Sequence, residues 1–165
     1  METLPVKYLG VPLITRQLSD HDCAPLVAKI TERVRHWATK FLSYAGRLQL
    51  IQSVLFNVQN YWCRHFIVPK GVLKKISQIC SHFFWKGSEQ PAKGARVSWS
   101  TICLPKAEGG LGVKDILSWN RACIIQNIWS LITQAGSLWI AWVNAYILKG
   151  QSFWQVSPMQ SSSWS

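Results

Sequence analysis

The sequence lacks the features that would place it in a membrane or outside the cell. It contains no run of about 18 uninterrupted apolar residues, the length that a membrane-spanning helix needs. Its first residues, Met-Glu-Thr-Leu-Pro, have neither the basic nor the apolar region of a signal peptide. We therefore expect a soluble, intracellular protein, and the sequence does not decide between nucleus and cytoplasm.

Paired cysteines and clustered metal ligands are missing as well. The five cysteines are odd in number and lie 17 to 40 residues apart, which argues against a disulfide framework and against a zinc motif. The four histidines are scattered, and the pair His21 and Cys23 has no second pair of ligands nearby. We expect reduced core thiols, among them Cys80 and Cys123, with no bound metal and no cofactor.

Acidic residues are scarce: seven Asp and Glu stand against 18 Lys and Arg, giving a net charge of +11. The charges sum to +3 over residues 1–60, +7 over 61–114 and +1 over 115–165. A local basic excess is typical of proteins that bind a polyanion, because each Lys or Arg beside a phosphate releases condensed counterions. An anionic membrane surface is the competing interpretation, although no segment is a clean basic amphipathic helix.

The shortage of carboxylates also bears on catalysis. Metal-dependent chemistry on nucleic acid needs two or three converging carboxylates, and only Asp20 and Asp22 lie close together in sequence. Their place at a predicted helix start suits them to capping. The segment GGLGVK at 109–114 lacks the Gly-Lys-Ser/Thr ending of a phosphate loop and is expected to form a turn. We expect no catalytic residue in this chain and no enzymatic activity of its own.

What the sequence does contain is a strong helical pattern. Apolar residues make up 48% of the chain and recur at intervals of three or four, which predicts a mainly α fold with a buried core. An extended segment or hairpin arm is expected over residues 4–14, and the Ser-rich tail 151–165 is expected to be disordered. Helices are predicted over residues 19–40, 43–65, 69–85, 98–103, 115–134 and 137–148.

Several side chains receive specific predictions from this pattern. Phe41 is placed on the apolar stripe of the first helix, and Ser19, Asp20 and Asp22 are candidates for its cap. Gly46 is expected to mark a close approach of two backbones. The segment 86–114, with five glycines, is expected to be flexible and rich in loops. Core packing is favoured over base stacking for four tryptophans: Trp37, Trp62, Trp85 and Trp99.

Five blocks, in order, resemble a known family. LPVKYLGVPL, LSYAGRLQLIQSVLFNVQNYW, FFWKG, VSWSTICLPKAEGGLGVKDI and SLWIAWVNAYILKGQSFWQV are similar to the post-catalytic part of plant reverse transcriptases from non-LTR (LINE-type) retrotransposons. The resemblance covers residues 4–156. It implies a bundle-like thumb and connector: a palm-edge remnant at 1–18, thumb helices at 19–86, a basic connector at 87–114 and a helical pair at 115–150.

The resemblance also implies a partner, the RNA/DNA template-primer. The Tyr-Leu-Gly segment closes the family's palm beside the primer, which places Tyr8 and Gly10 there. Charge on the predicted polar helix faces adds candidates for contacts with phosphates: Lys29, Arg33, Lys40 and Arg47. Three lysines at the start of the third long helix, Lys70, Lys74 and Lys75, are further candidates, because the helix dipole disfavours cations there and an outside anion would offset it.

Departures from the family pattern shape the functional prediction. The family's metal-binding Ala-Asp-Asp motif would precede Met1, the Cys/His-rich segment expected after SFWQV is replaced by serines, and Ala45 stands where a second glycine is expected. We therefore predict a non-catalytic fragment of an RNA-directed DNA polymerase that binds nucleic-acid backbone. Two alternatives stay open: a protein-interaction module built on the Trp-rich residues 115–154, and a retroelement remnant without function.

Overall fold

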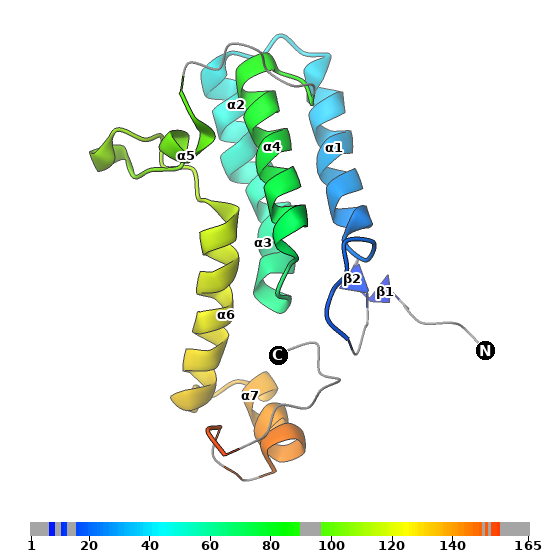
Figure 1. Cartoon of the computed structure of the whole chain (residues 1–165), viewed down its shortest axis with the longest axis vertical. Coiled ribbons are helices and arrows are strands. Elements are labelled where there is room, and N and C mark those ends of the chain that lie inside the picture. The colour runs from blue at the N-terminus through cyan, green and yellow to red at the C-terminus, as the bar shows by residue number, and fades with distance from the viewer. Residues whose placement is uncertain are drawn as a thin grey trace, which may run out of the picture.

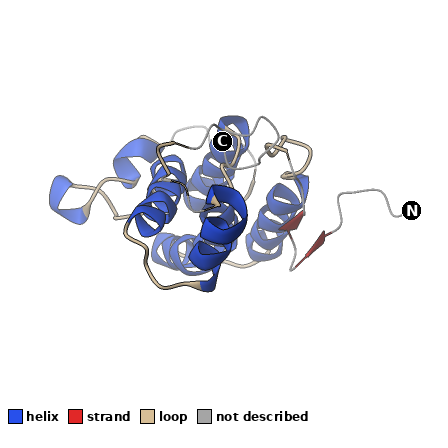
Figure 2. Cartoon of the chain, turned by 90° about the horizontal axis from the view of Figure 1, so that it is seen from below, coloured by secondary structure: helices blue, strands red, loops and turns tan. Residues whose placement is uncertain are grey.

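The computed structural model describes residues 7–8, 11–12, 16–89, 97–149, 151 and 153–155. These residues form a mainly α-helical protein, which confirms the predicted fold class (Figure 1). The predicted extended segment is a two-residue antiparallel pair, β1 (Lys7–Tyr8) and β2 (Val11–Pro12), with Tyr8 opposite Val11. Figure 2 shows this pair at the edge of the helices. The expected disordered tail lies mostly outside the described residues.

A helical bundle forms the larger part of the molecule. Its elements are α1 (Ala24–Ala38), α2 (Tyr44–Leu50), the π-helix η1 (Ile51–Leu55), α3 (Phe56–His65) and α4 (Lys70–Lys86). The residues that join α2, η1 and α3 all have helical backbone angles, so the three form one continuous rod. Helix α1 runs parallel to α4, because Ala24 and Gly71 line one hollow while Arg35 pairs with Glu89 beyond the end of α4.

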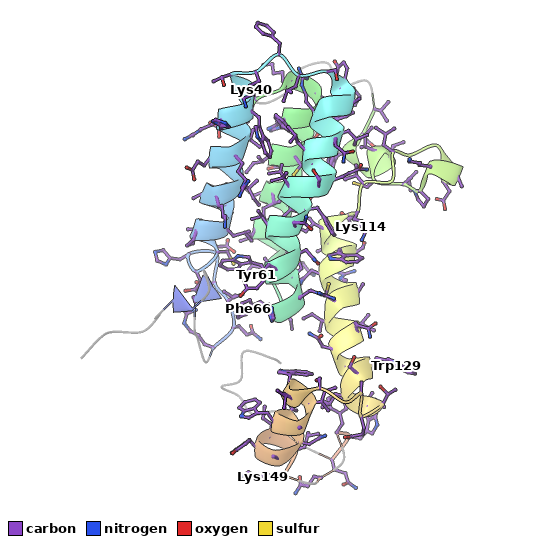
Figure 3. All side chains as sticks on the ribbon, turned by 180° about the vertical axis from the view of Figure 1, so that it is seen from behind. Lys40, Tyr61, Phe66, Lys114, Trp129 and Lys149 are labelled. Carbon is purple, nitrogen blue, oxygen red and sulfur yellow. The ribbon has the colours of Figure 1, made fainter. Side chains whose placement is uncertain are left out.

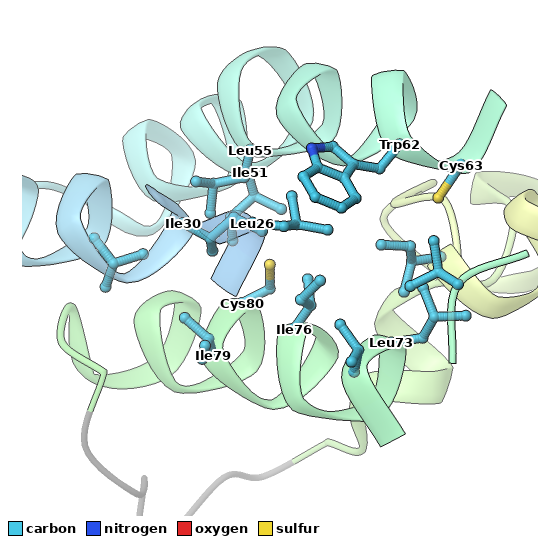
Figure 4. Close-up of a cluster of buried hydrophobic side chains, with 14 of the residues drawn as sticks. Leu26, Ile30, Ile51, Leu55, Trp62, Cys63, Leu73, Ile76, Ile79 and Cys80 are labelled. Atoms are coloured by element: carbon cyan, nitrogen blue, oxygen red, sulfur yellow. The ribbon is translucent and has the colours of Figure 1, made fainter. Parts of the chain in front are cut away.

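The core of the bundle lies between α1, the α2–α3 rod and α4 (Figure 4). Helix α4 contributes most to it, with Ile76 and Phe83 fully buried. Trp62 is buried, and Trp37, Trp85 and Trp99 pack against the core, so the prediction that these four tryptophans pack is confirmed. Burying side chains of this size contributes about 1.5–3 kcal/mol each to folding, and the bundle therefore has the means to fold as one unit.

The first helix begins differently from the prediction. It begins at Ala24, without a side-chain cap, and Pro25 sits in its first turn, where a missing N–H does no harm. Asp22 closes the preceding turn instead: its carboxylate accepts hydrogen bonds from Arg16 Nη1 at 2.7 Å and from the Ser19 backbone N–H at 2.8 Å. The hydrogen bond from Arg16 holds the pKa of the buried Asp22 well below its usual value. The capping prediction was wrong because this ion pair takes the carboxylate.

Two other local predictions were wrong. Phe41 is fully exposed, because α1 ends at Ala38 and the chain turns before Phe41 can join the apolar stripe. Gly46 makes no close backbone approach: its N–H binds Ser43 Oγ at 3.2 Å, and a Cβ there would meet that oxygen at an ordinary 3.5 Å. Gly46 therefore lies in the capped first turn of α2, and packing does not require a glycine there.

Residues 97–114 are more ordered than the glycine content predicted. They form α5 (Trp99–Ile102), the 3-10 helix η2 (Lys106–Glu108) and a tight return loop. Gly110 lies directly on the backbone, since a Cβ at that position would be 1.9 Å from the carbonyl oxygen of Leu104. Ile102 and Val113 are buried in the bundle core. The short helix predicted at 98–103 is therefore confirmed as α5, and residues 90–96 lie outside the described part of the chain.

The C-terminal helices form a second, smaller cluster. Helix α6 (Ile116–Ile132) is capped by Asp115, whose carboxylate accepts from Ser118 N at 2.9 Å, so the predicted turn and cap are confirmed. It is followed by α7 (Leu138–Trp142) and the π-helix η3 (Val143–Leu148). Helix α6 packs on α3 along its first half, and its Leu131 then joins a small core with residues of α7 and η3. Among the described residues, no helix is both long and apolar enough to cross a membrane.

The cysteines are all free thiols, as predicted. Burial raises the pKa of the Cys63 and Cys80 thiols to about 12. Cys123 is only half-buried, which departs from the expectation of a core position. Thiols that stay protonated in this way are poor nucleophiles and poor metal ligands.

Candidate nucleic-acid interface

A long part of the bundle carries no negative charge. Between Arg33 and Ser88 the sequence contains nine Lys and Arg and no Asp or Glu. This interval holds the end of α1, the whole α2–α3 rod and α4. The interval itself therefore supplies no acidic partner for its cations, although Asp20 and Glu89 from outside it lie beside Lys75 and Arg35.

The three lysines of α4 lie on one end of the bundle. Lys70, Lys74 and Lys75 are all exposed within the first turns of α4. The partial positive charge of a helix N-terminus, about half an elementary charge, adds to theirs. Lys75 also lines a shallow hollow beside Asp20 and Ala28, so one carboxylate lies near the group. The structure brings these predicted residues together.

A second group of cations follows α1. Lys29 and Arg33 are separated by four residues, which places them on one flank of the helix, and Lys40 lies two residues beyond its end. Lys29 and Lys40 are exposed and Arg33 is half-buried. Lys40 lies at the opposite end of the bundle from Phe66 (Figure 3).

The two groups face different ways. Ala24 and Ala28 of α1 line the hollow that contains Lys75, and Arg35 reaches Glu89 after α4, so this flank of α1 faces α4. Helical spacing places Lys29 on the other flank. The predicted contacts therefore lie in two separate groups.

Arg47 has an internal role in this structure. Its Nη1 donates to the carbonyl oxygens of Phe84 and Trp85 at 3.2 and 3.3 Å, and its guanidinium lies 5.3 Å from the centre of the Tyr44 ring. Gly87, with a φ of +76°, leaves the space that this side chain occupies. Arg47 thus neutralises the C-terminal carbonyls of α4, and we leave it out of the proposed interface.

The two predicted residues beside the primer are described only in part. The backbone of Tyr8 pairs with Val11 in the short hairpin. Gly10 lies outside the described residues. Their expected contact with a primer stays a prediction.

One cation site was missed by the sequence reasoning. The ammonium of Lys114 lies 3.7 Å from the centre of the Trp119 ring and 4.8 Å from that of Phe56. Neither helix periodicity nor charge counting could have joined these residues, because Phe56 is 58 positions before Lys114. The described residues contain no group of three His, Cys, Asp or Glu side chains placed to hold a metal ion.

Two plant proteins are similar to this chain. One, from Arabidopsis thaliana, bears the name "Putative ribonuclease H protein" and is 32% identical over 129 residues, which is 78% of this chain and 21% of that protein. The other, an "Uncharacterized mitochondrial protein" of the same plant, is 30% identical over 74 residues, 44% of this chain and 48% of that protein. The matches thus span about a fifth and about half of the lengths of these relatives. No family model and no solved structure matches.

Proposed function

We propose that this chain is the nucleic-acid-binding thumb and connector section of a retroelement protein related to non-LTR reverse transcriptases. It holds the sugar-phosphate backbone of an RNA/DNA hybrid without reading sequence. The observation that carries the proposal is the group formed by Lys70, Lys74 and Lys75, exposed at a helix N-terminus inside an interval without acidic residues. Similarity to a plant protein named as a ribonuclease H protein supports a partner of the same chemical class.

Binding without cleavage is part of the proposal. Three of the carboxylates already have structural partners: Asp22 binds Arg16, Glu89 binds Arg35, and Asp115 caps α6. Metal-dependent hydrolysis needs two or three carboxylates that converge on one site. Catalysis would therefore come from other parts of the proteins to which this chain is related.

The test is fluorescence anisotropy with a labelled RNA/DNA hybrid at two salt concentrations. Each phosphate contact contributes about 0.9 to the slope of log affinity against log salt, so three contacts predict a loss of about 40-fold between about 50 and about 200 mM salt. The RNA strand, incubated with the chain and Mg²⁺, stays uncut. Affinity that is absent at low salt, or indifferent to salt, would overturn the proposal.

A second candidate function is self-association, and a specific surface favours it. Helix α6 is apolar on both sides: one packs on α3, and the other exposes Ile125, Ile128, Trp129 and Ile132, spaced as one helical stripe. Figure 3 shows Trp129 projecting on the side of α6 that is turned away from α3. A helix that is apolar all round is normally covered.

A second copy of this chain is the occupant that the charges favour. Residues 122–148 contain no Asp, Glu, Lys or Arg, so the stripe from Ile125 to Ile132 is itself uncharged, and Arg121 lies one turn before it. An isologous contact would pair the α6 stripe of one copy with that of the other. Large aromatic side chains are the usual anchors of such interfaces.

Trp129→Ala is expected to weaken dimerisation at least about 30-fold, since an aromatic anchor contributes about 2 kcal/mol or more. Sedimentation velocity over a concentration series measures this, and Trp142→Ala, from the same uncharged segment, is expected to act in the same direction. The matched control is Phe41→Ala, an exposed aromatic residue outside the segment. A parent chain that stays monomeric at all concentrations would contradict self-association.

A further inference from the structure

A hollow in the larger core has a lining that points to a ligand. It has a volume of about 280 Å³ and lies between the α2–α3 rod, α4, α5 and the start of α6. Apolar walls come from Ile51, Ile76 and Trp99. Small-molecule sites usually measure about 300–1,000 Å³, so the space suits a single planar group rather than a larger molecule.

Gln59 is the polar group at the inner wall. Its side chain is part of a residue that is only 5% exposed, and it lines the hollow. Its Nε2 donates to Cys80 Sγ at 3.6 Å, and no other hydrogen bond of this side chain is present among the described residues. Sulfur is a weak acceptor, so the carboxamide keeps an oxygen acceptor and an N–H donor for a ligand. Burying an amide without such partners is unfavourable.

The carboxamide of Gln59 limits which ligands can bind in the hollow. The carboxamide presents one donor and one acceptor side by side, and its complement is a planar edge with an acceptor beside a donor. Nucleobases have such edges, and a Gln side chain can bind adenine through two hydrogen bonds. An aliphatic side chain of a protein partner would leave Gln59 unpaired.

At the opening of the hollow, the ammonium of Lys114 lies over the rings of Phe56 and Trp119. Lys114 and Phe56 both line the hollow, and the Phe56 ring meets the Trp119 ring edge-on with centroids 5.4 Å apart. Trp119 is fixed in turn, because its Nε1 donates to Asn60 Oδ1 at 2.8 Å. Figure 3 shows Lys114 at the start of α6, beside the α2–α3 rod. An ammonium at this place can bind a phosphate attached to a base in the hollow.

The backbone around the hollow is also irregular. Its wall includes the π-helix η1, from which Gln52 Nε2 donates to the carbonyl oxygen of Leu111 at 3.3 Å. Single π turns inside α-helices are rare and occur often at functional sites. The bond from Gln52 ties the return loop, which ends at Lys114, to the rod.

We propose that this hollow binds one unstacked nucleotide, with its base against Gln59 and its phosphate at Lys114. This inference rests on the proposed function, because the partner is the same nucleic acid. The second contact is with an unpaired nucleotide of that nucleic acid. The lysines of α4 hold the backbone, and the hollow holds a base that has left the stack.

The test uses the full chain and two probes. The first is adenosine 5′-monophosphate, titrated by calorimetry beside inorganic phosphate and adenosine; the nucleotide is expected to bind more tightly than either part. The second is an RNA/DNA hybrid with one unpaired terminal 2-aminopurine, a fluorescent base whose emission is expected to change when it enters the hollow. Base contacts of this type are worth a factor of about ten.

Gln59→Met keeps the volume of the side chain and removes the carboxamide. It is expected to weaken nucleotide binding about tenfold and to abolish the 2-aminopurine response, while a blunt hybrid binds as before. Gln78→Met, an exposed glutamine of α4 outside the hollow, is the matched control. A thermal melt checks the fold, and Lys114→Gln gives a second variant at the mouth.

The outcomes separate the two proposals. Loss of all hybrid binding with intact nucleotide binding would overturn the proposed function and leave the hollow's assignment in place. Normal salt-dependent hybrid binding with no nucleotide binding would overturn the assignment alone. Uptake of an apolar dye but no nucleotide would show that the hollow receives an apolar group, which also overturns it.

Discussion

Replacing Lys70, Lys74 and Lys75 together by glutamine is expected to make the salt dependence of hybrid binding shallower by about 2.7 on logarithmic axes, because each lost phosphate contact removes about 0.9. The three side chains are exposed and lie at a helix end. Glutamine removes their charge and keeps most of their length, and the fold is expected to be unaffected. Anisotropy titrations of parent and variant at several salt concentrations measure the difference.

The matched control removes three charges elsewhere. Lys86, Lys106 and Lys149 are exposed and lie apart from both proposed surfaces, so their replacement by glutamine lowers the net charge equally. If the control lost as much affinity as the α4 variant, attraction would follow total charge and the surface would have no special role. Replacing Lys29, Arg33 and Lys40 by glutamine tests the second basic group in the same way. A larger loss of hybrid affinity in that variant than in the α4 variant would show that the second group is the main contact.

Asn120→Ala is expected to lower the free energy of unfolding by about 3 kcal/mol or more, because buried groups left without partners lose about 1–3 kcal/mol each. Asn120 is 4% exposed and serves three backbone groups of the turn between α3 and α4. Its Oδ1 accepts from Val68 N at 3.1 Å, and its Nδ2 donates to the carbonyl oxygens of Cys63 and Phe66 at 3.0 and 2.8 Å.

Thermal unfolding followed by circular dichroism measures the effect. A loss of about 3 kcal/mol lowers the melting temperature by about 6–12 °C in a chain of this size. Asn57→Ala, at an exposed position of α3, is the matched control and is expected to change stability by less than about 0.5 kcal/mol. Equal melting of the two variants would contradict the role of Asn120. A broad, non-cooperative melt of the parent would instead favour the alternative of a remnant without function.

Helix positions with local signals were predictable from sequence. Helix α4 was predicted from Pro69 and α6 from Asp115, and both begin at the following residue. In each case the signal is chemical and local: Pro fixes its own backbone angle, and a carboxylate accepts from a nearby N–H. The same logic failed before α1, where Asp22 binds Arg16, six residues before it.

Faces and distant contacts were harder to predict. Helix α6 carries apolar residues on both sides, so periodicity could not tell that Ile125 and Ile128 lie outside the core. Arg47 was assigned to a phosphate, although its acceptors lie 37 and 38 residues later at the end of α4. Charge and spacing describe one helix at a time, and these outcomes depend on which helix end lies beside which side chain.

In the candidate site, too, local features were predictable and contacts between distant residues were not. Spacing predicted Lys29, Arg33 and Lys40 on one polar face, and the structure has Lys29 and Arg33 on α1, whereas Lys40 follows the end of the helix at Ala38. No pattern in the sequence joins Gln59 with Lys114, because the hollow forms only when α3, α4 and the return loop come together.

Helix α6 contributes to both hydrophobic clusters, and this affects how the chain unfolds locally. Its first half is held in the large core and by Asn120, whereas its last turn joins a cluster with only four buried side chains. A cluster of that size cannot stay folded by itself, so α7 and η3 can detach as a separate unit while the bundle remains closed. We therefore expect the C-terminal helices to have low local stability, and a partner that binds their apolar face would stabilise them.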